Sequence, residues 1–407
     1  MNRVYIGIDW SERKHDVAFV NPAGGHIATL TLPHSLDGFR QFEATCQKLG
    51  LPPEACLVGM ETAHNLFIDF LWSRAYSEVY IIPPSVVKSS RGRYGPSGAH
   101  TDKTDALLIA NLLRTDLARF HPWHPGSLLT RQIRAQVSLI TYLTRKGISA
   151  ANRLRAVLLR YYPAALETFG HLRSQIALEF IQAFPSPQAA QALTLDELKA
   201  FAAAQGYTRP RRLPGYLAAL QAPQLQATPE TVLIYQEEAA LLAAHTLSLR
   251  IAKSNALRKL SKLFDQHPDA PIFASLPGAA DFLAPALLGF FGEDRERFPT
   301  ARSIQCLAGT CPVTEQSGKR RIVKFRYACD HDFRTVAQQW AKGSLSQSTW
   351  ANAYWRQVRP HCRTNSHAYR CLANRWLAVL WKMWHTRQTY DEAYHLQQRA
   401  KHTKPRN

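Results

Sequence analysis

The chain has 407 residues, of which 50 are Lys or Arg and 30 are Asp or Glu, so its formal charge at neutral pH is +20. This length allows two or three domains, and the positive charge indicates a polyanionic partner, with nucleic acid the commonest and a membrane surface the rival. An apolar run of ~20 residues, a signal peptide and a repeating cysteine spacing are all missing, so we expect a cytoplasmic protein that does not enter a membrane.

Three short apolar runs open the chain, at residues 4–8, 17–20 and 26–32. Polar turns of a few residues separate them, which is typical of three antiparallel strands joined as a meander. Asp9 ends the first run. A carboxylate on the central strand of such a sheet is costly to desolvate unless a divalent cation or a structural hydrogen-bond network compensates it.

Helix and strand patterns alternate after this meander. Residues 35–50 read as a capped amphipathic helix, and residues 55–60 as a buried strand with Glu61 at its carboxyl end. A helix through residues 67–71 and a strand at 79–82 follow. This order predicts a ribonuclease-H-like α/β fold, in which ligands gather at the carboxyl ends of the strands.

Residues 89–99 are rich in Gly, Ser and Arg and include Arg91 and Arg93. We interpret them as a mobile loop that contacts phosphates, with a plain surface loop nearly as good an explanation. A helix start follows, with Asp102 and Asp105 in its first turn. Because the two acids are three residues apart, they project from one helical face.

Two long helices are predicted in the middle of the chain, at residues 127–162 and 229–267, with short helices across 164–223 between them. The second repeats apolar residues at every seventh position: Leu242, Leu249, Ala256 and Leu263. Thr246 and Lys253 interrupt the companion seam. We expect a coiled coil that forms a stalk or a dimer contact, and the basic face of the first helix could follow a phosphate backbone or simply be solvated.

Two short turns of the C-terminal part could contact phosphates. Pro277-Gly278 stands between predicted helices, where backbone N–H groups could bind a phosphate or form an ordinary turn. Ser317-Gly318 could present an exposed hydroxyl in a phosphate-binding loop, although most such pairs are simple turns. Five cations follow it: Lys319, Arg320, Arg321, Lys324 and Arg326.

Residues 333–390 contain no Asp or Glu and hold six of the nine tryptophans. Interleaved cations and aromatic rings suit a surface that pairs with phosphates and stacks unpaired bases. For Trp376, Trp381 and Trp384 a place in the core of one helix is the better explanation.

Four carboxylates stand out along the chain: Asp9, Glu61, Asp102 and Asp105. In a ribonuclease-H-like fold they would converge at one edge of the sheet, where carboxylate oxygens could bind two divalent cations for phosphodiester cleavage. Asp102 and Asp105 could instead be ordinary charges at a helix N-terminus. We assign an ordinary role, outside any metal site, to three further acids: Asp16, Asp69 and Asp116.

Several motifs occur in a characteristic order. The N-terminal half contains Gly7-Ile8-Asp9-Trp10-Ser11, Lys14-His15-Asp16-Val17, Met60-Glu61-Thr62 and Thr101-Asp102-Lys103-Thr104-Asp105-Ala106. The C-terminal half contains Leu276-Pro277-Gly278, Arg297-Phe298, Leu307-Ala308-Gly309 and Gln316-Ser317-Gly318. Together they resemble the DEDD transposases of mobile elements, the insertion sequence 110 family.

The resemblance implies a bacterial or archaeal, nucleoid-associated DNA recombinase guided by a non-coding bridge or seek RNA that pairs with target and donor DNA. It implies a RuvC-like ribonuclease-H-fold domain at 1–125, a helical coiled-coil region at 126–269, and a mainly α-helical C-terminal transposase domain at 270–407. The family acts as a tetramer, so we expect a homo-oligomer, either a dimer or a tetramer.

The resemblance also assigns roles to residues. Asp9, Glu61, Asp102 and Asp105 would bind Mg²⁺ or Mn²⁺, and Ser317 would attack the phosphodiester to form a phosphoserine link. The basic loop at 319–326 would stabilise phosphate charge. This segment has few glycines compared with the family, which predicts a stiffer loop.

Other functions explain parts of the pattern. A RuvC-like nuclease or a site-specific DNA invertase without guide RNA is the nearest alternative. An actin-like ATPase or sugar kinase would explain the opening strand but needs later phosphate and adenosine loops, and a non-catalytic RNA-binding protein leaves the ordered acids unexplained. We expect no zinc site, because the four candidate ligands lack paired spacings: Cys306, Cys311, Cys329 and His331.

Overall fold

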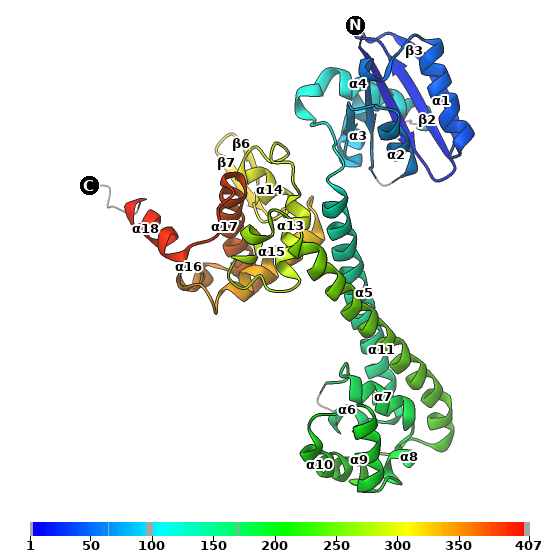
Figure 1. Cartoon of the computed structure of the whole chain (residues 1–407), viewed down its shortest axis with the longest axis vertical. Helices are drawn as coiled ribbons and strands as arrows, with labels where there is room; N and C mark the ends of the chain where they lie inside the picture. Colours follow the sequence, from blue (N-terminus) through cyan, green and yellow to red (C-terminus); the bar gives the residue numbers. More distant parts are fainter. Residues whose placement is uncertain (1–2, 64, 95–100, 169–170, 403–407) are drawn as a thin grey trace. The chain divides into compact units, whose positions relative to one another are not determined.

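The computed structural model describes residues 3–63, 65–94, 101–168 and 171–402 (Figure 1). The chain divides into two compact units, residues 1–125 and 126–407. Within the described ranges, no helix is long and apolar enough to cross a membrane.

A five-stranded sheet forms the centre of the first unit. Its spatial order is β3-β2-β1-β4-β5. The strands are β1 (Val4–Trp10), β2 (Lys14–Val20), β3 (His26–Pro33), β4 (Cys56–Met60) and β5 (Val79–Ile81). Strands β1 to β3 pair antiparallel, which confirms the predicted meander, and β4 and β5 run parallel to the central β1.

Helices cover both faces of this sheet. They are α1 (Leu36–Lys48), α2 (Leu66–Ser73), α3 (Pro84–Ser90) and α4 (Asp102–Asp116), with short 3₁₀ turns at Pro53–Ala55, Arg91–Tyr94 and Leu117–Arg119. Val58 of β4 packs into one core with Phe67 of α2, while Leu57 packs into another with Leu108 of α4. Successive strand residues point to opposite faces, so the mixed sheet lies between helical layers, consistent with a ribonuclease-H-like fold.

The two predicted long helices of the second unit are confirmed as α5 (Leu128–Tyr161) and α11 (Pro229–Asp265). They pack side by side and antiparallel. Ile133 near the start of α5 shares a core with Phe264 near the end of α11, and Leu158 shares another with Val232. Between them the described residues form five shorter helices: α6 (Ala164–Thr168), α7 (Gln175–Ala183), α8 (Pro187–Gln191), α9 (Leu195–Ala204) and α10 (Leu213–Gln221), with a 3₁₀ turn at Pro210–Arg212.

The remaining chain is mainly helical, with one β-hairpin. Its elements are α12 (Ala270–Ala274), α13 (Leu283–Phe291), α14 (Ala301–Leu307), β6 (Val313–Ser317), β7 (Arg320–Lys324), α15 (His331–Ser344), α16 (Thr349–Val358), a 3₁₀ turn at Arg359–His361, α17 (Asn365–Thr386) and α18 (Glu392–His402). One apolar core joins these helices to the ends of α5 and α11 that lie near them.

The tryptophans of this region do not form the base-stacking surface considered from the sequence. Trp340, Trp376 and Trp384 are fully buried, and Trp350 is 4% exposed. Trp355 and Trp381 are half-buried and pack against the same core. The stacking interpretation is therefore wrong for Trp340 and Trp350, whereas the expected core place of Trp376 and Trp384 is confirmed.

Candidate active site

Asp9 and Glu61 lie at the same edge of the first unit's sheet. Ile8 of β1 and Met60 of β4 are direct partners in a parallel ladder, and each acid is the next residue along its strand. Because parallel strands end at one edge, the two carboxyl groups emerge there together.

The N-terminal turn of α4 brings Asp102 and Asp105 to this edge. Thr101 caps the helix, and it forms a reciprocal capping box with Thr104. The helix lies directly on β1 because Gly7 has no side chain: a Cβ there would stand 2.0 Å from the Ala106 carbonyl oxygen. The glycine two residues before Asp9 therefore allows α4 to present its acidic first turn to the strand.

The electrostatics show that the four acids share one field. Burial, and then the negative charges of Glu61, Asp105, Asp102 and Asp16 in decreasing order, together raise the pKa of Asp9 to about 7. Burial, and then the charge of Asp105, also raise the pKa of Glu61. Carboxylates perturb each other in this way only when they are a few ångströms apart.

Two cations partly compensate the acids. Lys14 Nζ lies 2.9 Å from an oxygen of Asp102 and 3.1 Å from one of Asp16. Arg91 donates from Nη2 and Nε to the two oxygens of Asp105, at 2.7 and 3.2 Å. Neither cation was assigned to this cluster from the sequence, because their contacts depend on strand register and on a turn before α4.

Asp16, which was expected to have an ordinary role, is a strand residue beside the acidic cluster. It lies on β2 directly opposite Asp9, it is buried, and Thr31 donates to its Oδ1 at 2.5 Å. Asp116 is the last residue of α4, where hydrogen bonds from Thr115 and then from Arg93 lower its pKa. Asp69 does lie in the first turn of α2. The apolar pattern at 17–20 predicts a strand, and extending that strand back by one residue would have placed Asp16 on it.

The segment at 89–94 is helical rather than a loop, whereas residues 95–99 lie outside the described residues. Arg93 forms an ion pair with Asp116 at 3.0 Å, as Arg91 does with Asp105. Both arginines predicted to contact phosphates are therefore paired with carboxylates in this structure.

The donor set of the cluster suits a divalent cation. Carboxylate oxygens are the ligands that Mg²⁺ and Mn²⁺ prefer, and burial together with the neighbouring acids raises the pKa of Asp9 although Lys14 and Arg91 pair with Asp102 and Asp105. The acids are not drawn together around one point, since no three of their oxygens form a group within 4.8 Å among the described residues. Such spacing is compatible with ligands placed around two ions about 4 Å apart.

Ser317 lies in the second unit, at the end of β6 in an exposed hairpin. It pairs with Arg320 of β7, and Gly318 and Lys319 form the two-residue turn between them. Gly318 has a φ of +55°, as a glycine at the first central position of such a turn does. The predicted phosphate-binding loop is therefore a β-hairpin with a two-residue turn.

Contacts at the base of the hairpin fix it to the helices. Arg326 Nε donates to the Cys311 carbonyl at 3.2 Å. The Phe325 ring lies 4.5 Å from the guanidinium carbons of both Arg334 and Arg370. Lys324 pairs with Glu315 across the strands at 2.5 Å. Arg326 and Lys324 thus support the hairpin itself.

Three of the predicted phosphate-binding cations remain exposed at the tip of the hairpin: Lys319, Arg320 and Arg321. None of them forms an ion pair within the part of the chain that the structure describes. They follow Ser317-Gly318 directly in the sequence, and Arg320 is the cross-strand partner of Ser317.

The Pro277-Gly278 turn does not offer a free amide to phosphate. Gly278 N–H donates to Gln347 Oε1 at 2.7 Å, and a Cβ at Gly278 would stand 2.3 Å from the Gly343 backbone. The ordinary turn is therefore the better explanation of this motif.

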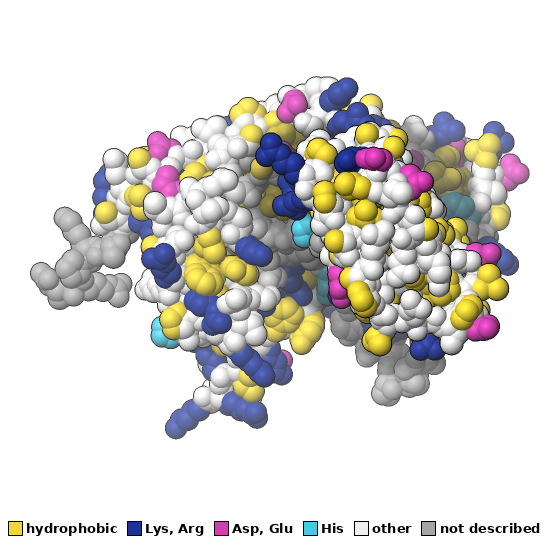
Figure 2. Space-filling view, turned by 90° about the horizontal axis from the view of Figure 1, so that it is seen from below, with side chains coloured by type: hydrophobic (Ala, Val, Ile, Leu, Met, Phe, Trp, Pro, Cys, Tyr) yellow, Lys and Arg dark blue, Asp and Glu magenta, His cyan; other side chains and the backbone are white. Residues whose placement is uncertain are grey.

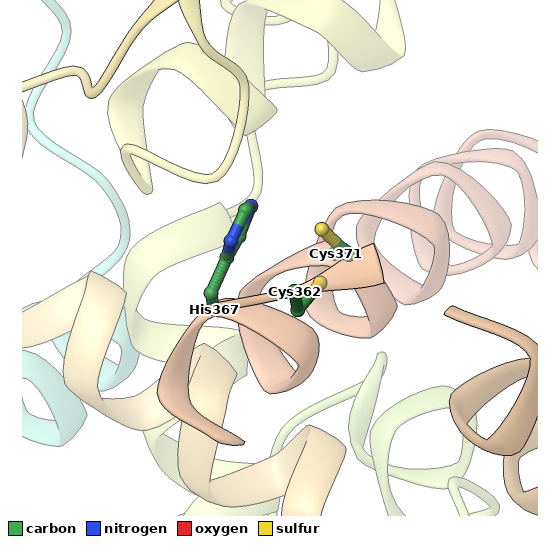
Figure 3. A group of neighbouring side chains, drawn as sticks. All are labelled: Cys362, His367 and Cys371. Atoms are coloured by element: carbon green, nitrogen blue, oxygen red, sulfur yellow. The ribbon is translucent and has the colours of Figure 1, made fainter. Parts of the chain in front are cut away.

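A second group of possible metal ligands lies away from the residues weighed from the sequence. Cys362 precedes α17, and His367 and Cys371 lie one turn apart on it, with their three donor atoms within 4.8 Å of one another (Figure 3). Structural zinc sites use four ligands. Burial and the neighbouring Cys362 raise the pKa of Cys371 to about 11, which opposes formation of a metal-binding thiolate.

Two family models match the chain. A DEDD model described as "Transposase" matches residues 6–163, and one described as "Transposase IS116/IS110/IS902 family" matches residues 270–356. The first match contains all four acids, and the second contains Ser317.

Curated relatives match nearly end to end. The mini-circle putative transposase for IS117 of Streptomyces coelicolor is 32% identical over 405 residues, covering 96% of this chain and 95% of the relative. An uncharacterized 42 kDa protein of insertion element IS900 from Mycobacterium paratuberculosis is 26% identical, covering 96% and 98%. An uncharacterized 43.6 kDa protein of insertion element IS110 from Streptomyces coelicolor is 22% identical, covering 93% of each.

Proposed function

The chain belongs to the IS110 family of DEDD transposases, which are DNA-cutting enzymes, and from that premise we propose that it is an RNA-guided recombinase that cuts and rejoins DNA through a serine intermediate. A DEDD transposase domain implies divalent-metal catalysis in general. The observation that carries the proposal is the shared field of Asp9, Glu61, Asp102 and Asp105 in one unit, together with the exposed Ser317 hairpin in the other.

The four acids would hold Mg²⁺ or Mn²⁺ at the edge of the sheet. When bound, the metal would supply charge stabilisation for the attacking and leaving oxygens. Asp16 holds Lys14 close to Asp102 and adds negative charge beside Asp9. Lys14 and Arg91 then keep the acidic cluster folded until a cation replaces part of their pairing.

Ser317 would act as the nucleophile. Its Oγ forms a bond to phosphorus as the P–O bond to one deoxyribose breaks, and the serine proton passes through water to the departing oxygen. The phosphoserine ester conserves the energy of the broken bond, so attack by a second DNA hydroxyl rejoins a strand and restores the serine. Lys319, Arg320 and Arg321 at the hairpin tip would stabilise the charge of the phosphate oxygens.

Guide RNA and DNA are the proposed partners. The formal charge of +20 supports a polyanionic partner, and Lys and Arg side chains are more frequent than Asp and Glu on the face shown in Figure 2. RNA that co-purifies with the protein can be sequenced, and the proposal expects one non-coding species from the end of the element. Recombination by protein stripped of RNA would identify a site-specific invertase instead.

We place the acids of one protomer against the serine of another in a dimer or tetramer. A mixing experiment tests this assembly. Asp9→Asn protein and Ser317→Ala protein should each be inactive, and co-assembled protomers should regain partial strand transfer if the site is shared. If mixtures stay inactive while each variant still oligomerises, the acids and the serine act within one chain.

A further inference from the structure

A basic cavity lies in the second unit beside the paired long helices. It has a volume of about 560 Å³ and is lined by α5, α11 and the segment at 171–174 that leads into α7. This volume falls within the range of small-ligand pockets and could contain about one nucleotide. The cavity belongs to neither the acidic cluster nor the serine hairpin.

The lining of the cavity carries positive charge only. Arg155, Arg173, Arg250 and Lys253 contribute side chains, together with His171, and no Asp or Glu lines it. None of the four cations forms an ion pair among the described residues. Burial, and then the charge of Arg173, lower the pKa of Lys253. Such like-charge crowding costs free energy unless an anion relieves it.

The cavity coincides with a break in the apolar seam of α11. Thr246 and Lys253 occupy positions between the apolar Ala239 and Leu260, and both line the cavity. Across it, Gly147 of α5 faces open space, because a Cβ there would meet no atom within 4 Å. Apolar side chains at these positions would let the two helices pack against each other. Thr246 and Lys253 therefore weaken the helix packing without a structural gain. Breaks of this kind are expected at functional sites.

The segment before α7 completes the cavity. Ser174 caps α7 by accepting from Ala177 N–H, and Arg250 Nη1 donates to the Arg173 carbonyl at 3.3 Å. The positive end of the α7 dipole therefore adds to the charge of the side chains. The N-terminus of α7, the four cations that form no ion pair among the described residues, and the cavity between them all favour an anionic ligand.

We propose that this cavity binds a backbone phosphate of the nucleic acid held by the transposase, as an anchor outside the catalytic residues. RNA and DNA share this chemistry. The proposal requires only that the protein binds nucleic acid, and not that Ser317 is the nucleophile or that the RNA is a guide.

Lys253→Gln in the full-length protein tests the anchor, with Lys259→Gln as the matched control because Lys259 is an exposed lysine of the same helix outside the cavity lining. Fluorescently labelled single-stranded RNA and duplex DNA of arbitrary sequence are titrated at several salt concentrations. We expect Lys253→Gln to weaken binding roughly 3- to 10-fold and to lower the salt slope by about one, beyond the effect of the control.

Lys253→Leu separates binding from folding. Leucine restores the apolar seam, so this variant should melt at or above the temperature of the wild type and still bind weakly. A loss seen only with RNA assigns the phosphate to RNA, and a loss seen only with duplex DNA assigns it to DNA. If the variants at 253 bind both probes as tightly as the Lys259→Gln control, the anchor is overturned. If Ser317 is not the nucleophile, Ser317→Ala protein still forms the covalent protein–DNA adduct. The difference in nucleic-acid affinity between the variants at 253 and the Lys259→Gln control remains in that case.

Discussion

Replacing Asp9 by asparagine should stabilise the metal-free protein at pH 8. Burial and four neighbouring acids raise the pKa of Asp9 from 3.8 to about 7, a shift of about three units. At about 1.4 kcal/mol per unit this corresponds to roughly 4 kcal/mol of unfavourable interaction in the ionised folded state. Because Asp9 is only partly buried, solvent screening reduces the expected gain to about 2 kcal/mol.

The pH dependence of this gain follows from linkage. The folded pKa is raised, so between about pH 4 and pH 7 the folded state holds a proton that the unfolded state has lost, and stability falls as pH rises through that window. The advantage of Asp9→Asn should be full above pH 7, well under half as large at pH 5, and absent below pH 4. Mg²⁺ should stabilise the wild type and leave the variant unchanged.

Calorimetric unfolding at pH 5 and pH 8 measures this effect. A gain of about 2 kcal/mol raises the melting temperature of a unit of this size by about 8 °C. Asp69→Asn is the control, since Asp69 is an exposed acid in the first turn of α2. A lower melting temperature for Asp9→Asn at pH 8 would refute the idea that burial and the neighbouring acids disfavour the ionised Asp9 carboxylate.

Three further outcomes are expected. Ser317→Ala should eliminate any protein–DNA adduct on a denaturing gel and leave DNA affinity within about twofold, because the hydroxyl is exposed and makes no core contact; a persisting adduct would place the nucleophile elsewhere. Lys14→Met should tighten Mn²⁺ binding several-fold by removing a competing cation from Asp102, and unchanged affinity in a titration would contradict that role. Nucleic-acid affinity of the wild type should fall steeply with salt in a filter-binding assay, whereas salt-insensitive binding would exclude a phosphate-based contact.

Much of the first unit could be predicted from the sequence because its signals are local. The apolar runs ending in Asp9 and at Glu61 read directly as strands, and Thr101 before Asp102 marks a helix start. The parallel pairing of β1 with β4 then follows from the order of elements. Once the order of elements had indicated the fold, no further long-range contact was needed to place Asp9 and Glu61 at one edge of the sheet.

The sequence was least informative where contacts between distant residues determine the structure. Asp16 depends on the register of β2 against β1, which places it opposite Asp9. The polar, basic segment after Pro312 forms a hairpin only because its strands pair with each other and its base packs on Arg334 and Arg370. Trp340 of α15 and Trp350 of α16 suit a binding surface in the sequence and are core residues in three dimensions.

Divalent-metal binding tests the central claim most directly. Mn²⁺ titration of the full-length protein, followed by calorimetry at pH 8, should show binding by the wild type and by Asp69→Asn, and loss of that binding in both Asp9→Asn and Glu61→Gln. If either of the latter two variants bound Mn²⁺ as tightly as the wild type, the acids at the ends of β1 and β4 would not form the metal centre of this transposase.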